Sequence, residues 1–325
     1  MHFLNALWYK EGVASWPLVP FSILYNWVTI LRRKLYRAGI LAKHTFSVPV
    51  IVVGNITVGG TGKTPLVMYI VELLRKEGFH PGIVSRGYKG SHQKPVSVTE
   101  DSDPALVGDE ALLLVRRLGC PMVVGKDRAF AVQTLLQNTM VNVVVADDGL
   151  QHYALHRDIE IAVVDGERRF GNGHCLPAGP LRELPERLKS VDMIVNNGKA
   201  IAGEFEMRYE PDLVLNVLTA QQLPLQDFRG QKVHAIAGIG NPARFFDFLR
   251  TKGLEIMPKA FPDHYHFEAK DILFNDGYPV IMTEKDMVKC QRFVDERHWV
   301  LPISIQIDPA FDEKLLRLIK GWQHG

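Results

Sequence analysis

The sequence is poor in cysteine. Only three of its 325 residues are cysteines, and Cys120, Cys175 and Cys290 lie far apart without forming a CxxC pair. Neither a disulfide framework nor a zinc site made of thiolates has the spacing that it needs. This use of cysteine is typical of a protein from a reducing compartment.

A large excess of charge of one sign is also missing. The sequence has 38 Lys and Arg residues against 36 Asp and Glu residues, so its formal net charge is +2. Because proteins that bind nucleic acid usually carry a strong basic excess, we expect no nucleic-acid partner. The hydrophobic content of 46% is that of a globular protein. The length allows about two domains, and nothing in the sequence points to a particular oligomeric state.

The most apolar part of the chain is too short to span a bilayer. It extends from Trp16 to Leu31, contains two prolines near its start, and is followed at once by four basic residues. A spanning helix needs about 20 apolar residues. Tryptophan and tyrosine favour the headgroup region, and basic side chains favour anionic lipid. We therefore predict that residues 1–44 form a membrane-associated helical segment on the membrane surface. The alternative is an amphipathic helix packed on the core.

From residue 45 onward, short apolar runs alternate with stretches of helical periodicity. This alternation is typical of βαβ units around a mostly parallel sheet, so we expect an α/β domain over residues 45–203. Its strands are expected at residues 49–54, 81–85, 122–125, 141–146, 159–164 and 192–196, and its helices at residues 65–77, 108–118 and 128–137.

A second, smaller α/β domain is expected over residues 204–325. Residues 205–218 break into short strand-like pieces, and residues 232–237 and 241–252 have the pattern of a new strand and helix. The remaining expected elements are strands at residues 278–283 and 299–307 and a terminal helix at residues 313–322.

A glycine-rich loop stands where the first strand should turn into a helix. Its sequence from Val53 to Pro65 is VGNITVGGTGKTP, in which Thr57 occupies the place of the leading glycine of the G-x-x-x-x-G-K-[ST] pattern. Glycines let backbone N–H groups converge on phosphate oxygens, and the positive end of the following helix adds to the attraction. The side chain of Lys63 would reach the β- and γ-phosphates of a nucleoside triphosphate. The residues predicted to hold the phosphates are Gly59, Gly60, Thr61, Gly62, Lys63 and Thr64.

A second signal supports the phosphate loop. Residues 141–146 form an apolar run that ends in Asp147 and Asp148, as in a Walker B strand. Such a strand lies beside the strand that carries the loop, and its terminal carboxylate holds Mg²⁺ directly or through water. Two adjacent carboxylates at a buried strand end repel each other unless a cation neutralises them. The alternative interpretation of this pair is a solvated acidic turn. The two signals predict a P-loop NTPase-like sheet with Mg²⁺ held by Thr64, Asp147 and Asp148.

Residues that act on the phosphate acceptor must lie outside this loop. Asp109 opens a predicted helix in the sequence GDE, where a carboxylate is either a catalytic group or a simple N-terminal cap. His264 follows Asp263 in the sequence FPDHYHF, and a histidine beside a carboxylate can act as a base. A metal site formed with His266 and a purely structural role are the alternatives.

Two further charged positions point to an anionic ligand. Arg182 and Glu183 follow a Gly-Pro turn, the sequence TEKD (283–286) stands at the end of a predicted strand, and surface ion pairing is the alternative interpretation of both stretches. Arg86 ends another predicted strand, which would place it on the same rim as the phosphate loop.

Eight motifs occur along the chain, and they are VGNITVGGTGKTP (53–65), SRGY (85–88), GDE (108–110), DDGLQH (147–152), LPAGPLRE (176–183), GIGNP (238–242), FPDHY (261–265) and TEKD (283–286). In this order they resemble the tetraacyldisaccharide 4′-kinase family of lipid A synthesis in Gram-negative bacteria. Eight motifs in the same order are far more specific than any one of them, and the family's own loop departs from the strict pattern in the same way.

The resemblance implies a reaction, a place and a set of roles. The γ-phosphate of ATP would pass to the 4′-hydroxyl of a lipid-linked disaccharide 1-phosphate, at the cytoplasmic face of the bacterial inner membrane. Two α/β domains would be joined by a short β-ribbon. Asp109 would accept the proton of the sugar hydroxyl, assisted by His264, while Asp263 orients the loop. His152, Arg182 and Glu183 also match active-site positions of the family.

The main alternative function is a membrane-recruited P-loop ATPase switch of the MinD-like kind. Such a switch would carry a signature lysine near the start of its loop, where Asn55, Ile56 and Thr57 stand instead. A soluble kinase for a small metabolite would leave the apolar segment near the N-terminus unexplained.

Overall fold

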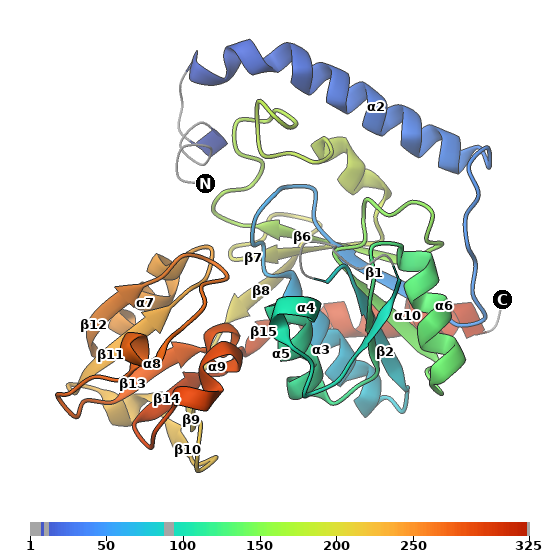
Figure 1. The fold of residues 1–325 in the computed structure, drawn as a ribbon. Helices are drawn as coiled ribbons and strands as arrows, with labels where there is room; N and C mark the ends of the chain where they lie inside the picture. The colour runs from blue at the N-terminus through green and yellow to red at the C-terminus, as the bar shows by residue number, and fades with distance from the viewer. Residues whose placement is uncertain (1–7, 10–12, 88–93, 324–325) are drawn as a thin grey trace.

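The computed structural model of the protein describes residues 8–9, 13–87 and 94–323. Tyr88 of the SRGY motif, and residues 1–7 and 10–12 of the predicted membrane-associated segment, lie outside the described residues. In the described chain, the strands form two separate sheets, and one long helix crosses above the larger sheet (Figure 1).

The first sheet is mostly parallel, as the sequence predicts. Its strands are β1 (Val50–Gly54), β2 (Pro81–Ser85), β3 (Val96–Val98), β4 (Met122–Val124), β5 (Val143–Asp147), β6 (Ile159–Asp165), β7 (Met193–Asn197), β8 (Phe205–Tyr209) and β15 (Ile305–Ile307). They are arranged in the order β15-β8-β7-β6-β1-β5-β2-β4-β3. All neighbours from β8 to β4 are parallel, and only the edge strands β15 and β3 are antiparallel.

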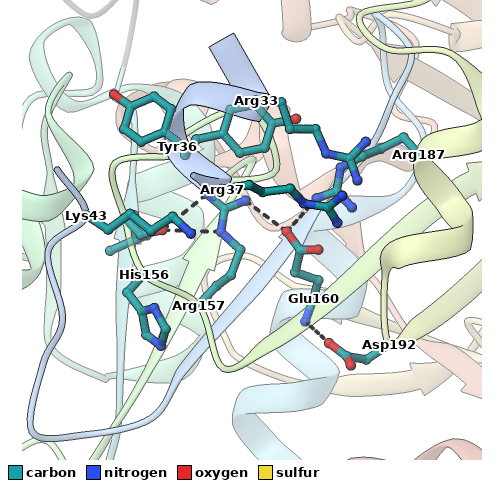
Figure 2. A pocket seen from close by; sticks show the side chains of 11 residues that line it. Arg33, Tyr36, Arg37, Lys43, His156, Arg157, Glu160, Arg187 and Asp192 are labelled. Carbon is teal, nitrogen blue, oxygen red and sulfur yellow. Dashed lines mark hydrogen bonds and ion pairs between the residues drawn. The ribbon is translucent and has the colours of Figure 1, made fainter. Parts of the chain in front are cut away.

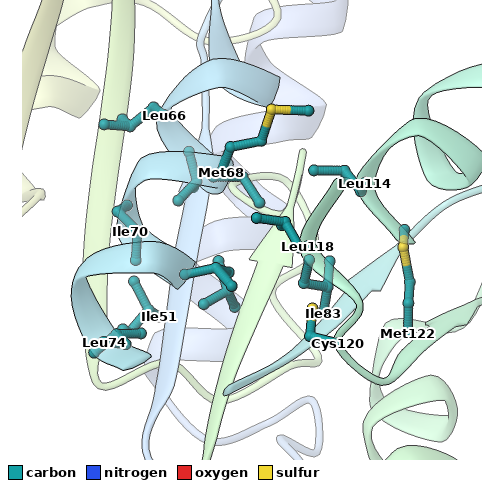
Figure 3. Packing of buried hydrophobic residues seen from close by; sticks show 14 of the residues in the cluster. Ile51, Leu66, Met68, Ile70, Leu74, Ile83, Leu114, Leu118, Cys120 and Met122 are labelled. Atoms are coloured by element: carbon teal, nitrogen blue, oxygen red, sulfur yellow. The ribbon is translucent and has the colours of Figure 1, made fainter. Parts of the chain in front are cut away.

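The central strands of this sheet are buried on both faces. The helices around it are α3 (Lys63–Lys76), α4 (Pro104–Val107), α5 (Asp109–Leu118), α6 (Arg128–Asn138) and α10 (Pro309–Gln323). Because side chains alternate along a strand, Ile51 points to the face that α3, α5 and α10 cover, and Val52 points to the face that α6 covers. Figure 3 shows Leu66 and Ile70 of α3 packed over the first of these faces. This double burial makes β1 a rigid base for the loop that follows it.

Helix α2 (Val19–Arg37) turns its polar side to the protein. It follows the 3-10 helix η1 (Val13–Leu18). The hydroxyl of Ser22 donates to the carbonyl O of Cys175 at 2.7 Å, and Arg33 donates to Oγ of Ser190 at 2.6 Å. A helix packed on the core would bury its apolar side. The exposed large apolar residues of α2 are instead Phe21, Ile23, Leu24, Trp27, Val28, Ile30 and Leu31. Among the described residues, none of the helices combines the length and apolar character needed to traverse a membrane.

The second sheet has its own core. Its strands are β9 (Leu213–Asn216), β10 (Gln222–Pro224), β11 (Lys232–Ala237), β12 (Glu255–Ala260), β13 (Val280–Thr283) and β14 (His298–Leu301), in the order β10-β9-β14-β13-β11-β12. The helices of this part are α7 (Pro242–Thr251), α8 (Ala269–Ile272) and α9 (Glu284–Cys290). The short 3-10 helices η3 (Leu225–Phe228) and η4 (Gln291–Phe293) also belong to this part, whereas η2 (Pro185–Ser190) precedes β7 of the first sheet. Figure 1 shows this smaller α/β unit beside the first sheet.

The expected strand at residues 299–307 is two strands. Strand β14 joins the second sheet, whereas β15 pairs with β8 in the first. Pro302 lies between them, and it has no backbone N–H to donate to a sheet. The chain therefore leaves one sheet and enters the other at this point.

The division between the two sheets differs from the expected boundary at residue 204. Strands β8 and β15 belong to the first sheet, and Phe311 and Leu315 of α10 lie in its core. Residues 213–301 are thus an insertion into the first unit. The chain enters the insertion after β8 and leaves it before β15, and these two strands pair antiparallel. The sequence pattern could not reveal this, because strand pairing depends on residues that are distant along the chain.

Candidate functional site

The loop between β1 and α3 leaves its backbone open to a ligand. Gly59 and Gly62 have φ values of 99° and 95°, in the left-handed region that favours glycine. A Cβ on Gly62 would lie 2.6 Å from Nδ2 of Asn197, which donates to the carbonyl O of Thr61 at 3.1 Å. A Cβ on Gly60 would meet nothing within 4 Å. Asn197 therefore braces one side of the loop, and the other side is open to phosphates at the N-terminus of α3.

Lys63, the first residue of α3, lies in a charged cluster. Its Nζ donates to Oδ1 of Asn55 at 3.2 Å and lies 3.4 Å from Oδ1 of Asp148. Arg182 reaches both oxygens of Asp148, at 2.9 and 3.0 Å. Strand β5, which ends in Asp147, is the parallel neighbour of β1, as expected of a Walker B strand. The structure thus brings three of the predicted site residues together in one contact network.

The adjacent carboxylates of Asp147 and Asp148 have opposite pKa shifts. Burial, reinforced by the negative charge of Glu110, raises the pKa of Asp147 to about 7. Burial also acts on Asp148, but Lys63 and Arg182 outweigh it and lower the pKa of Asp148 to about 2. Asp147 is only 3% exposed, and among the described residues its Oδ1 has no hydrogen-bond partner. Asp148 is therefore ionised at neutral pH, whereas among the described residues no cation forms an ion pair with Asp147, and the more distant Lys63 and Arg128 only partly offset the effect of burial.

The unpartnered oxygen of Asp147 fits a site for Mg²⁺. A divalent cation would satisfy this oxygen and favour the ionised carboxylate. Thr64, in the first turn of α3, could add a hydroxyl ligand, and Asp148 could act through water because Lys63 and Arg182 already contact it. In the parts of the chain that are described, no three His, Cys, Asp or Glu side chains come together as metal ligands. This suits an ion that takes most of its ligands from phosphate and water.

Asp109 and His264 come together from different parts of the chain. Nδ1 of His264 lies 3.1 Å from Oδ2 of Asp109, and Nζ of Lys289 lies 3.8 Å from the same oxygen. Asp109 is the first residue of α5 and is buried, and the N-cap of that helix is Gly108. Asp109 is therefore not the cap. His264 has a φ of 60°, a conformation that costs a non-glycine residue about 1–3 kcal/mol and that clusters at functional sites.

A cleft of about 560 Å³ opens beside this pair. Asp109 and His264 both line it, together with Arg116 from the first unit and Phe267 and Lys289 from the second. The volume is within the usual range for pockets that bind small molecules. A sugar hydroxyl that entered this cleft would meet the carboxylate and the imidazole.

Asp263 ties the loop of His264 to α5. Nζ of Lys285 lies 3.0 Å from Oδ1 of Asp263 and 3.3 Å from Oε1 of Glu110. Glu110 directly follows Asp109, and it is also the residue whose charge raises the pKa of Asp147. This ion-pair chain therefore links the second unit to α5 of the first.

Glu183 has different surroundings from Arg182. Its carboxylate is 4% exposed and accepts hydrogen bonds from Nε2 of Gln151, at 2.9 Å, and from the hydroxyl of Tyr153. Gln151 also donates to the carbonyl O of Asn55 at 3.1 Å. These contacts indicate that Glu183 supports the phosphate loop through Gln151, whereas Arg182 belongs to the charged cluster.

Several polar residues of the site were not predicted from the sequence. Asn197 ends β7, and the rule that ligands gather at the carboxyl ends of parallel strands could have identified it. Asn55 and Gln151 lie within recognised motifs, but no local pattern shows that they contact Lys63 and the loop. Lys289 lies on the short helix α9, and only the tertiary structure brings its buried ammonium to Asp109.

Comparison with known proteins gives one consistent result. The family model of the tetraacyldisaccharide-1-P 4′-kinases matches residues 14–320. The chain is 50% identical to a tetraacyldisaccharide 4′-kinase of Nitrosococcus oceani, over 96% of this chain and 93% of that protein. It is 48% identical to the tetraacyldisaccharide 4′-kinase of Methylobacillus flagellatus, over 97% and 95% of the two chains.

A solved structure gives the same result. A crystal structure of LpxK from Aquifex aeolicus in complex with ATP has a TM-score of 0.82 to this fold at 30% identity, and it covers 94% of this chain and 99% of that one. These matches do not favour the alternative of an ATPase switch.

The contrast between the two aspartates predicts opposite effects on stability. A carboxyl whose pKa is higher in the folded state binds more protons there, so stability falls as pH rises from about 4 to about 7. At about pH 8 without Mg²⁺, we expect Asp147→Asn to raise the free energy of unfolding by about 1–3 kcal/mol. Asp148→Asn is expected to lower it, because Lys63 and Arg182 lose their partner.

Thermal unfolding with and without Mg²⁺ and ATP measures both effects. Asp147→Asn should abolish the additional stabilisation that Mg²⁺ gives in the presence of ATP. The assignment of Asp147 is wrong if its variant is less stable without metal, or if it responds to Mg²⁺ as the native protein does.

Proposed function

The chain belongs to the tetraacyldisaccharide-1-phosphate 4′-kinase family, and from this premise and the geometry of its site we propose the reaction that it catalyses. It transfers the γ-phosphate of ATP to the 4′-hydroxyl of a tetraacyldisaccharide 1-phosphate, a step of lipid A biosynthesis. The observation that carries this proposal is the 3.1 Å contact between Nδ1 of His264 and Oδ2 of Asp109 at the edge of an open cleft. A kinase that uses an alcohol as acceptor needs such a base, whereas a nucleotide switch does not.

Asp109 accepts the proton of the acceptor hydroxyl. Its contacts with His264 and Lys289 both involve Oδ2, which leaves Oδ1 to receive the proton. His264 donates its Nδ1–H to Oδ2 and so fixes the orientation of the carboxylate. As the proton leaves, the sugar oxygen forms its bond to the γ-phosphorus, and the bond from that phosphorus to the β-phosphate oxygen breaks to release ADP.

The residues around the phosphate loop bind and neutralise the nucleotide. Lys63 and Arg182 already contact an anionic group in Asp148, and phosphate oxygens would take up the same donors. The open backbone from Gly59 to Gly62 supplies N–H groups to the phosphates. Mg²⁺ held by Thr64, Asp147 and Asp148 would supply further positive charge to the phosphates during transfer. Glu183 acts as a positioning residue through Gln151.

The membrane surface is the place where this reaction occurs. The support is the exposed apolar side of α2, on which Trp27 is 68% exposed and Phe21 and Leu24 are each 63% exposed. Apolar side chains have a lower free energy in contact with acyl chains than in contact with water. The acceptor can then keep its own acyl chains in the bilayer while its sugar enters the cleft. The use of ATP and the three buried free cysteines support the cytoplasmic face of the bacterial inner membrane.

A transfer assay tests the reaction directly. Purified protein is incubated with γ-labelled ATP, Mg²⁺ and a tetraacyldisaccharide 1-phosphate in detergent micelles. We expect label on the lipid, and we expect none when the acceptor already carries a 4′-phosphate. Hydrolysis of ATP without label on the lipid would support the ATPase switch instead.

Replacing three exposed apolar residues of α2 is expected to release the protein from membranes. Phe21→Ser, Trp27→Ser and Leu31→Ser together should weaken binding to lipid vesicles at least about 100-fold, because each side chain loses favourable burial. Transfer in detergent micelles should persist. Vesicle flotation measures the binding.

A second triple variant controls for the loss of exposed apolar surface. Met140, Ile201 and Leu218 are also exposed but lie outside α2, so replacing these three residues by serine should leave flotation unchanged. Equal flotation of the α2 variant and the native protein would refute the membrane assignment.

A further inference from the structure

A basic cavity lies under the C-terminal end of α2. Its volume is about 210 Å³, and Figure 2 shows it between α2 and the chain that leads into β6. The charged side chains that line it are Arg33, Arg37, Lys43, Arg157 and Arg187, against Glu160 and Asp192. Cations therefore outnumber carboxylates by five to two in its wall. Such an excess around a partly open pocket favours an anionic ligand.

Both carboxylates of the cavity already have partners. Glu160 accepts hydrogen bonds from Arg157 at 3.0 Å and from Arg187 at 2.5 Å, as the dashed lines in Figure 2 indicate. Asp192 accepts the backbone N–H of Glu160 at 2.7 Å. The acidic groups are thus used to hold Arg157, Arg187 and the start of β6 in place.

Arg33, Arg37 and Lys43, which we call the mouth of the cavity, have no carboxylate counterion among the described residues. Arg33 donates to Oγ of Ser190 at 2.6 Å, and Arg187 donates to the same oxygen at 2.8 Å, so two guanidinium groups meet at one neutral hydroxyl. Burial and the nearby charge of Arg187 lower the pKa of Arg33. Across the described ranges, no carboxylate lies within 4.0 Å of the charged groups of Arg33, Arg37 or Lys43. An anion in the cavity would supply the missing charge.

The cavity is separate from the phosphate loop, because its lining includes neither residues 59–64 nor Asp147, Asp148 and Arg182. Glu160 stands at the beginning of β6 and Asp192 just before β7, so the cavity lies at the amino ends of the parallel strands. The phosphate loop and Asp147 lie at the opposite, carboxyl ends of β1 and β5. In the register of the parallel pair, Glu160 lies opposite Val52 of β1, which is two residues, or roughly 7 Å along the strand, before Gly54. The cavity is therefore a separate site from the one proposed for the phosphates of ATP.

The cavity adjoins the apolar side of α2. Leu31 is 58% exposed, and Arg33 and Arg37 follow it within two turns of the same helix. A helix that lies on a bilayer buries its apolar side about 5–10 Å deep, at the boundary of headgroups and acyl chains. The basic mouth would then lie at the level of the lipid phosphates.

We propose that this cavity binds the phosphate of an anionic glycerophospholipid from the surrounding bilayer. The inference rests on the membrane contact proposed for α2 and adds a specific site to it. Arg33, Arg37 and Lys43 contact the phosphate, while Arg157 and Arg187 provide the positive wall behind it. The bound headgroup neutralises the cluster and fixes the C-terminal end of α2 at the membrane.

Matched pairs of substitutions test the site. Arg33→Gln with Arg37→Gln removes two charges from the cavity, and Arg32→Gln with Lys34→Gln removes two charges from the exposed part of the same helix. Flotation is measured with phosphatidylcholine vesicles that contain about a quarter phosphatidylglycerol, and with phosphatidylcholine alone. We expect the cavity pair to weaken binding to the anionic vesicles at least about tenfold more than the control pair, because an enclosed guanidinium–phosphate contact is stronger than a screened charge.

Binding to neutral vesicles separates this site from the membrane contact itself. The cavity pair should bind phosphatidylcholine vesicles as well as the native protein does. If the native protein itself does not bind these neutral vesicles, the proposed membrane contact of α2 is refuted instead. Equal losses by the two pairs on anionic vesicles would show a diffuse charge effect and overturn the cavity. Lys43→Gln, which removes no side-chain hydrogen bond among the described residues, should reproduce part of the loss if the double variant is unstable.

Two soluble probes separate the sources of the phosphate. Glycerol 3-phosphate and inorganic phosphate should leave the melting temperature of the native protein unchanged at about 1 mM, because neither is held at the membrane surface. The site would be assigned to a free phosphate if either compound raised the melting temperature of the native protein and if Lys43→Gln removed this effect without weakening vesicle binding. In neutral detergent micelles the cavity pair should keep the native KM for the acceptor. A raised KM would assign the cavity to the acceptor's own phosphate and overturn the proposal.

Discussion

Replacing Asp109 by asparagine is expected to lower kcat for phosphate transfer by about 10³-fold, within the range that general-base catalysis supplies. Asparagine has the shape of aspartate and can still accept from His264, but it cannot take the proton of the acceptor hydroxyl. ATP affinity should stay within about threefold of the native value, because the contacts of Asp109 are with His264 and Lys289 and not with the phosphate loop. Initial rates and direct measurement of nucleotide binding separate the two effects.

Asp103 offers a matched control for this variant. It lines the same cleft and caps α4 by accepting the N–H of Ala105 at 2.8 Å. Asparagine is an equally good cap, so Asp103→Asn should keep kcat within about twofold. The role assigned to Asp109 is refuted if its asparagine variant retains more than a tenth of the native kcat, or if it loses ATP binding together with catalysis.

Replacing Lys63 by methionine is expected to lower kcat by about 10²- to 10³-fold and to weaken ATP binding at least about tenfold. The ammonium stands at the N-terminus of α3 beside the open backbone of the loop, where positive charge is needed most as the γ-phosphate is transferred. Methionine keeps a similar length but removes the charge. Because Lys63 contacts phosphates both before and during transfer, the dissociation constant of ATP and kcat should both change, unlike in the Asp109 variant.

Lys76 provides the control for charge loss on the same helix. It lies in the last turn of α3 and is exposed, so Lys76→Met should change neither ATP affinity nor kcat by more than about twofold. Thermal unfolding checks the fold of the Lys63 variant, in which Asp148 keeps its contact with Arg182. Native ATP affinity in a folded Lys63→Met protein would show that this lysine does not bind the phosphates.

Local patterns in the sequence were enough for most of the fold. Strands β2 and β11 have the expected bounds, and the phosphate loop lies at the expected junction of a strand and a helix. Each of these features depends on residues that are contiguous in the chain. Alternation of side chains and glycine at strained positions can therefore be recognised without knowing what packs against them.

The candidate site was predictable only in part. The order of the motifs selected Asp109 and His264 through a family resemblance. The sequence around Asp109 alone could not distinguish a catalytic base from a helix cap. The contact of Lys289 with Asp109 and the support that Glu183 gives through Gln151 have no local signature. Both join residues that are distant in sequence.

The sequence by itself determined the phosphate loop, the Walker B strand and the apolar character of the N-terminal helix, because each is a property of adjacent residues. Only the tertiary structure decided that α2 turns its polar side inward, that residues 213–301 are inserted between β8 and β15, and that Asp147 and Asp148 have opposite pKa shifts. Burial and electrostatic interaction depend on distance in space, and the folded chain sets those distances.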